Sequence, residues 1–173
     1  RLSRPEEARA VLAAALERWP HSAQLHGAMA GVALDLNRRE EAVTHGREAL
    51  RLDPASLAGA LAASRALMTM GQFDEARTML GQVRQTRPND PRPCLLLAEV
   101  ESAAGRLGQA LNQIEQASRL PAAPALAEQI RQQRERLQKL MGIEDWQERF
   151  RAALDGRQLE RAREILRGLR ENL

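Results

Sequence analysis

The sequence predicts an all-α fold in which about ten helices stack as antiparallel hairpins into a solenoid. Composition is the first reason: aromatic residues make up 2% of the 173 residues, and Tyr is absent. β-Sandwiches and barrels are rich in aromatic and β-branched residues, so an all-β fold is excluded. The second reason is repetition, because small residues and prolines recur every 34 residues.

The repeated residues have a direct structural meaning. The small residues of one helix are Ala8, Ala42, Ala76 and Ala110, those of the other helix are Ala30, Ser64 and Ala98, and the closing prolines are Pro20, Pro54 and Pro88. Two helices cross closely only where the side chains between them are small. A proline cannot continue the helix that precedes it. Each 34-residue unit is therefore expected to be a pair of closely crossed helices that ends at its proline.

The helices follow from this register. They are expected near residues 4–19, 22–36, 39–52, 56–70, 73–86, 91–104, 107–119, 123–141, 144–155 and 158–171. By register the first of these is the second helix of a unit, which predicts a half repeat at 1–20 and a chain cut from a longer array. Full repeats are expected at about 23–56, 57–90 and 91–122.

These units resemble the tetratricopeptide repeat (TPR) family over about residues 1–122. Gly71 and Gly105 occupy the family's turn between helices, whereas His26, Ala60 and Cys94 replace its usual large aromatic residue. The last unit also ends one residue early. The resemblance implies a right-handed superhelix whose first helices line a concave surface that binds peptides or partner proteins.

The C-terminal quarter departs from the period. Residues 123–142 are expected to form a long helix that covers the end of the array, with Leu126 and Ile130 on its apolar side, and to stop at Gly142. Residues 143–173 then form a terminal hairpin, because Trp146 and Ala162 have the sixteen-residue spacing of the repeat. Alternatively, 123–141 and 144–155 form one degenerate unit, and 158–171 is a lone cap.

Charge and cysteine content exclude several classes of protein. The formal net charge is only +3, and the high pI of about 10.2 reflects an arginine excess with a single lysine. Neither a one-signed stripe nor aromatic platforms are present, so nucleic-acid binding is not expected. The single cysteine excludes an internal disulfide, and no apolar run is long enough to insert into a membrane. The compartment, cytoplasm or periplasm, stays open.

No residue pattern predicts catalysis, a cofactor or a metal. His21, His26 and His45 lack a ligand at metal-binding spacing on their own helical faces, so they are expected to be structural. Cys94 stands in a packing column and is expected to be a buried, inert thiol. The protein is therefore predicted not to be an enzyme.

The repeat register places one set of side chains on the concave face. From successive first helices these are Gln24, Gly27 and Gly31; Leu61, Arg65 and Met68; and Arg92, Leu95 and Glu99. The leucines and the methionine form an apolar floor, the glycines leave it bare at one end, and the arginines can pair with acids. We expect a peptide with one or two apolar anchors and an acidic residue. In the alternative interpretation, Leu61 and Leu95 pack between repeats.

The predicted function is a non-catalytic scaffold or adaptor for a partner protein. Bacterial members of the family often serve secretion, envelope or polysaccharide-export assemblies, and the arginine-rich, lysine-poor composition is typical of a GC-rich bacterium. One alternative is an assembly element that self-associates through its ends, including the apolar face of the N-terminal half repeat at Val11, Leu12 and Leu16. The other is a helical repeat that binds nucleic acid.

Overall fold

The computed structural model describes residues 4–156 and 158–172, and every element in these ranges is a helix. The helices are α1 (Arg4–Arg18), α2 (Ala23–Asp35), α3 (Arg39–Leu52), α4 (Leu57–Thr69), α5 (Phe73–Thr86), α6 (Pro91–Ala103), α7 (Leu107–Ser118), α8 (Pro124–Asp155) and α9 (Leu159–Asn172). The predicted all-α class is confirmed, and the first seven helices end within one or two residues of the expected positions.

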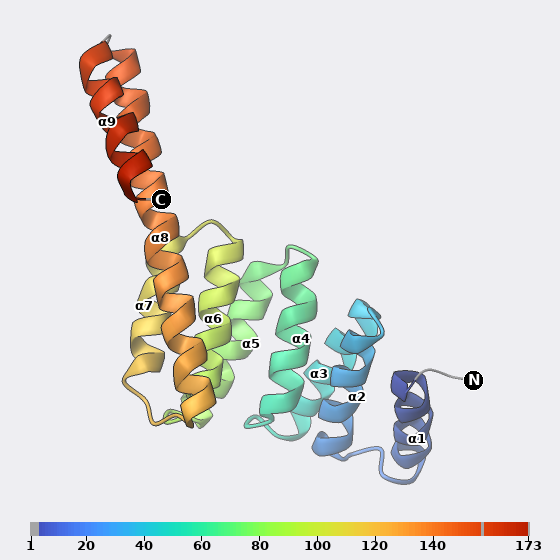
Figure 1. Ribbon diagram of the computed structural model, residues 1–173. Helices are drawn as coiled ribbons and strands as arrows, with labels where there is room; N and C mark the ends of the chain where they lie inside the picture. The colour runs from blue at the N-terminus through green and yellow to red at the C-terminus, as the bar shows by residue number, and fades with distance from the viewer. Residues whose placement is uncertain (1–3, 157, 173) are drawn as a thin grey trace.

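The helices are arranged in two rows (Figure 1). α2, α4, α6 and the first half of α8 form one row, and α3, α5 and α7 lie behind it. Each helix packs on the next in sequence, and α2 also packs on α4, as α4 does on α6. At one end α1 packs on α2; at the other end α8 runs past the stack and pairs with α9.

The turn inside each hairpin is set by one residue with a left-handed backbone. Asn37, Gly71 and Gly105 have φ values of 57°, 75° and 75°, and they are 34 residues apart. The amide after each of them donates to a carbonyl five residues back: Arg38 to Ala33 (2.8 Å), Gln72 to Leu67 (2.9 Å) and Arg106 to Glu101 (2.8 Å). This is the Schellman closure of a helix C-terminus, which glycine and asparagine accommodate at low cost.

Two apolar clusters hold the stack together. The first runs from α2 to α6, and Leu67 and Leu80 at its centre have no exposed surface. The second joins α6, α7 and α8 through Leu95, Ile114 and Ile130. Burial of each such side chain contributes about 1.5–3 kcal/mol, so most of the stability lies in these contacts between neighbouring helices.

Glycines bring α3 and α4 unusually close. A Cβ at Gly46 would lie 2.6 Å from the carbonyl oxygen of Gly59, and a Cβ at Gly59 would lie 2.6 Å from the Cβ of Ala49. Both distances are far below van der Waals contact. The α3–α4 crossing therefore requires glycine on each helix.

The predicted helix end at Gly142 is wrong, because α8 runs without interruption from Pro124 to Asp155. The described residues thus hold nine helices rather than ten, and the degenerate-unit alternative is also wrong. Glycine inside a helix costs only about 1 kcal/mol, and the residues on both sides of Gly142 are strong helix formers. A Cβ at Gly142 would meet no atom within 4 Å, so no close contact requires glycine there.

The predicted terminal hairpin is present, although it shares its first helix with the covering helix. Trp146 Nε1 donates to the carbonyl of Ile165 (2.9 Å), and the Trp146 ring stacks on Phe150 with ring centroids 5.4 Å apart. The amide of Gln158 donates to the carbonyl of Ala153 (2.8 Å), the same closing bond that the repeats use. This hairpin is therefore repeat-like in its turn.

Candidate peptide-binding surface

The row formed by α2, α4 and α6 presents part of the predicted residue set to solvent. Gln24 and Arg92 are exposed at the start of α2 and α6. Arg65 is exposed in the middle of α4, and its repeat equivalents Gly31 and Glu99 are half-exposed. These two columns of the repeat face outwards.

A third column lies between the helices instead of on the surface. Gly27 is buried, and a Cβ there would lie 3.2 Å from the backbone nitrogen of Gly59. Leu95 is 6% exposed and belongs to the cluster that contains Ile130 of α8. Leu61, the member of this column on α4, is half-buried against the first cluster. Gly27 and Leu95 are thus packing residues, because neighbouring first helices meet along this column, and only Leu61 keeps an accessible edge.

Contacts with α8 occupy the α6 part of the surface. Gln133 Nε2 of α8 donates to Glu99 Oε1 (2.9 Å), so the Glu99 carboxylate already has a partner. Arg92 forms a two-pronged ion pair with Asp90 (2.9 and 2.6 Å), which holds the pKa of the Asp90 carboxyl below its ordinary value. Both charges are therefore already partly neutralised within the protein.

The α2 and α4 part of the surface is open. A Cβ at Gly31 would meet no atom within 4 Å, so the backbone of α2 is accessible there. Leu61 and Met68 are half-buried on α4, one turn on either side of Arg65. Within the described ranges, Arg65 has no ion-pair partner. This part combines an accessible backbone, two apolar side chains and one available cation.

The sequence prediction missed three members of this face. Ala28 and Asp35 on α2 and Thr69 on α4 are exposed, and each lies four residues after a predicted member, Gln24, Gly31 or Arg65. Residues four apart share a helical face, so continuing the spacing by one step would have found them. Asp35 puts a negative charge at the far end of α2.

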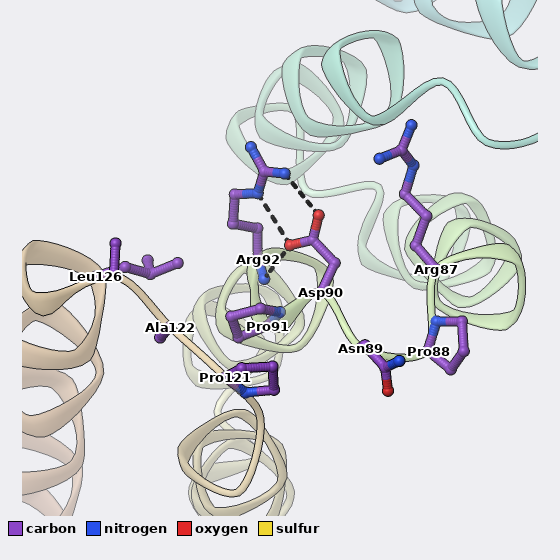
Figure 2. Close-up of a pocket in the computed structure, with 10 residues that line it drawn as sticks. Arg87, Pro88, Asn89, Asp90, Pro91, Arg92, Pro121, Ala122 and Leu126 are labelled. Atoms are coloured by element: carbon purple, nitrogen blue, oxygen red, sulfur yellow. Dashed lines mark hydrogen bonds and ion pairs between the residues drawn. The ribbon is translucent and has the colours of Figure 1, made fainter.

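A separate cleft of about 620 Å³ lies at the edge of the stack (Figure 2). The loop before α6 and the first two residues of α6, Arg87 to Arg92, form one wall, and the segment from Pro121 to Leu126 forms the other. Asp90 and Arg92 pair with each other at its side, and Arg87 Nε donates to the carbonyl of Ala55 (2.7 Å). The cleft's charged side chains are thus engaged in internal hydrogen bonds.

His26, His45 and Cys94 lie in partly or fully buried packing positions. His26 Nε2 donates to the carbonyl of Pro20 (3.0 Å), and its Nδ1 shares a hydrogen bond with Nδ1 of His45 (2.9 Å). Burial, followed by the charge of His26, lowers the pKa of His45. Cys94 is buried, and burial raises the pKa of its thiol, which makes it unreactive.

Two further features bear on cofactors and membranes. Across residues 4–156 and 158–172, no three His, Cys, Asp or Glu side chains are grouped so as to hold a metal ion. In the same part of the chain, no helix has the length and apolar character needed to span a bilayer.

Comparison with protein families matches tetratricopeptide repeats to residues 1–56, 40–93 and 67–133. Comparison with curated proteins returned no match.

Solved structures share the fold at low sequence identity. TTC0263, a thermophilic TPR protein of Thermus thermophilus, aligns with a TM-score of 0.68 and 21% identity over 96% of this chain and 91% of its own. A structure of MamA aligns with a TM-score of 0.64 and 11% identity over 99% of this chain and 98% of its own. YrrB, described as a TPR protein with an unusual peptide-binding site, aligns with a TM-score of 0.60 and 19% identity over 78% of this chain and 68% of its own.

Proposed function

Because this chain belongs to the tetratricopeptide repeat family, we propose that it is a non-catalytic scaffold that binds a peptide segment of a partner protein on the open surface of α2 and α4. YrrB, a structural neighbour described as having a peptide-binding site, supports this class of function. The proposal keeps Gly31, Leu61, Arg65 and Met68 from the predicted set and leaves out Gly27 and Leu95, which are packing residues.

One observation carries the proposal: Arg65 is an exposed cation, unpaired among the described residues, between two half-buried apolar side chains. An arginine in such a position binds a carboxylate through two parallel hydrogen bonds. Leu61 and Met68 offer apolar contact on either side of it, and the flexible thioether of Met68 adapts to different side chains. The expected ligand therefore carries an acidic group beside one or two apolar residues.

Gly31 and Asp35 determine how such a peptide lies. Without a side chain at Gly31, the ligand backbone approaches α2 closely. Asp35 repels an acidic residue at the other end of α2, so the acidic group is expected next to Arg65 and away from Asp35. A basic ligand residue near Asp35 would add to the affinity.

The experiment is selection of peptides from a random displayed library on the immobilised protein, followed by anisotropy titration of the enriched peptides. We expect enrichment of an acidic residue within a few positions of an apolar one. Arg65→Glu is expected to weaken binding of these peptides by about 1–3 kcal/mol, because it removes the pairing cation and adds repulsion.

Arg134→Glu is the matched control, since Arg134 is an exposed arginine of α8 in a pocket that faces α7. It should leave both the peptide affinity and the melting temperature unchanged. Equal loss of affinity in both variants would indicate a non-specific charge effect. Unchanged binding by Arg65→Glu would place the site elsewhere.

A further inference from the structure

The described side chains of the terminal hairpin form only a small core. It consists of the second half of α8 together with α9, and it projects away from the stacked helices (Figure 1). Among its described side chains the buried ones are Ala153 and Ala162, whereas Trp146 and Phe150 are half-buried. Two alanines supply little hydrophobic stabilisation, and helix pairs of this size are marginal without further packing.

Among the described side chains of this hairpin, four large apolar ones are exposed to solvent. On α8 these are Ile143 (38% exposed) and Leu154 (45%), and on α9 they are Leu159 (62%) and Leu166 (45%). The two residues on α8 are eleven positions apart, which is about three helical turns, and the two on α9 are seven positions apart, which is about two turns. Each pair therefore lies on one apolar stripe along its helix.

The two stripes lie on the same side of the hairpin. Leu154 follows Ala153 on α8, and Leu166 follows Ile165 on α9; Ala153 and Ile165 line the seam between the helices. When two right-handed helices pack antiparallel, the residue that follows a seam residue on one helix and the residue that follows a seam residue on the other both lie on the same side of the hairpin. We use the name hairpin face for the surface that these stripes form together with Phe150: Ile143, Phe150, Leu154, Leu159 and Leu166.

The opposite side of the hairpin is polar. Asp145 and Arg149 form an ion pair on α8 (3.5 Å), and Arg161 is exposed on α9. A hairpin inside a solenoid is apolar on both sides, because a neighbour packs on each. A hairpin with one apolar side accepts a single further layer, as in a closed two-fold dimer.

Charges of both signs are mixed on the hairpin that bears this face. Among its described side chains in 142–155 and 158–167, five exposed residues are acidic and five are basic: Asp145, Glu148, Asp155, Glu160 and Glu164, and Arg149, Arg151, Arg161, Arg163 and Arg167. An anionic membrane or a strongly charged peptide would be matched by a surface of one sign. A surface of mixed charge is compatible with an identical copy of itself.

We propose that the hairpin face binds the hairpin face of a second copy of this chain, so that two hairpins form a four-helix bundle. The surface of α2 and α4 lies outside this interface on each copy. This interface does not depend on the peptide-binding proposal, since it involves none of the same residues.

The test is the molar mass of the chain in solution, measured by light scattering or sedimentation from about 1 to about 200 μM. The wild-type chain is expected to rise from 19.2 kDa towards twice that mass as its concentration increases. The double variant Leu154→Asp/Leu166→Asp should stay monomeric over the range. Leu159→Asp alone should weaken dimerisation at least tenfold. It should not destabilise α9, because an acidic residue in the first turn of a helix is stabilising.

Val11→Asp is the matched control, because Val11 is an exposed apolar residue (69%) on α1, at the other end of the molecule. It should dimerise like the wild type, and circular dichroism should give the same helical signal for all variants. A wild-type chain that stays monomeric over this concentration range would overturn the proposal. Dimerisation that survives Leu159→Asp, or that Val11→Asp abolishes, would also overturn it.

Discussion

The two halves of the stack are held together by different means. Between α2, α3 and α4, glycines and alanines let the helix backbones approach closely, as at Gly46 and Gly59. Between α6, α7 and α8, large side chains such as Leu95, Ile114 and Ile130 fill the space instead. Helix packing in the N-terminal half therefore depends on small residues at the crossings, and helix packing in the C-terminal half depends on large apolar side chains between the helices.

This difference explains where the surface is open. In the N-terminal half, small residues complete the packing and leave Gly31 bare and Arg65 unpaired on the surface among the described residues. In the C-terminal half, α8 covers Leu95, and its Gln133 binds Glu99. A repeat array can thus offer a binding surface along part of its length while an adjoining helix covers the rest.

The largest expected effect is at the glycine contact. Gly46→Ala places a Cβ 2.6 Å from the carbonyl oxygen of Gly59, and a rigid backbone cannot move away cheaply. The variant should lose about 1–3 kcal/mol of unfolding free energy, measured by urea denaturation. Gly81→Ala is the control, because a Cβ at this position of α5 meets no atom within 4 Å. It should be stabilised by about 0.5–1 kcal/mol, and destabilisation of both variants alike would contradict the close-approach explanation.

The next effect is at the buried carboxylate that links α5, α6 and the α6–α7 turn. Arg77 Nε and Arg106 Nε donate to the two oxygens of Glu101 (2.7 and 2.5 Å). Burial raises the pKa of Glu101, but these hydrogen bonds outweigh it, and the pKa lies below its ordinary value. Its contribution to stability is therefore present at neutral pH and is lost as the pH falls through the acidic range.

Glu101→Gln should accordingly cost about 1–2 kcal/mol at pH 7, a value reduced because both guanidinium groups are about one-third exposed. The cost should shrink at low pH, where the wild-type carboxyl is itself protonated. Urea denaturation at neutral and acidic pH measures both quantities. A cost that does not change with pH would mean that Glu101 stabilises by shape and not by charge.

A smaller effect is expected at the open floor of the surface. Gly31→Leu adds a side chain where a Cβ meets no atom within 4 Å, so the fold should tolerate it and gain up to about 1 kcal/mol in helix propensity. The side chain should at the same time block the ligand backbone and weaken binding of the selected peptides by about 1 kcal/mol. Unchanged affinity would mean that the peptide does not lie over α2.

The repeat period predicted most of the fold, because each repeated residue type marks a position where the packing or the turn requires it. Gly71 and Gly105 were placed correctly at hairpin turns. Asn37, the third member of that column, was not recognised, although its place in the 34-residue register and the tolerance of asparagine for the left-handed region both indicate it. The continuity of α8 through Gly142 was missed because one unfavourable residue is outweighed by its neighbours.

The candidate surface was predicted less well. The 34-residue register put Gly27, Leu61 and Leu95 in one column. Because the solvent-facing side and the packing side of a helix are adjacent, the register alone does not determine which of the two a column occupies. The position of α8 decided it for Leu95. Exposed members such as Ala28 and Asp35 were within reach of the same helical spacing.

The smallest predicted effect is a pH dependence at the N-terminal end. Burial and the nearby His26 lower the pKa of His45 below 6.5, with Arg9 of α1 acting in the same direction and Glu41 and Glu48 of α3 opposing it. The folded state therefore binds fewer protons than the unfolded state, and stability falls as the pH drops below 6.5.

Melting temperatures measured between neutral and mildly acidic pH should show this loss in the wild type. It should be worth less than about 1 kcal/mol, because solvent screens the half-buried ring. His45→Gln lacks the titrating group, so its melting temperature should change less over the same range. If the melting temperatures of the two proteins change identically with pH, the titration of His45 does not cause the loss of stability.

The central claim is that the open half of the row, α2 and α4, binds the peptide. Hydrogen–deuterium exchange with and without a peptide from the displayed library tests it directly. We expect slower exchange on binding in α2 (Ala23–Asp35) and α4 (Leu57–Thr69), with α5 and α7 unchanged. Protection confined to α5 and α7, or to the cleft between the Arg87–Arg92 segment and Pro121–Leu126, would contradict the account.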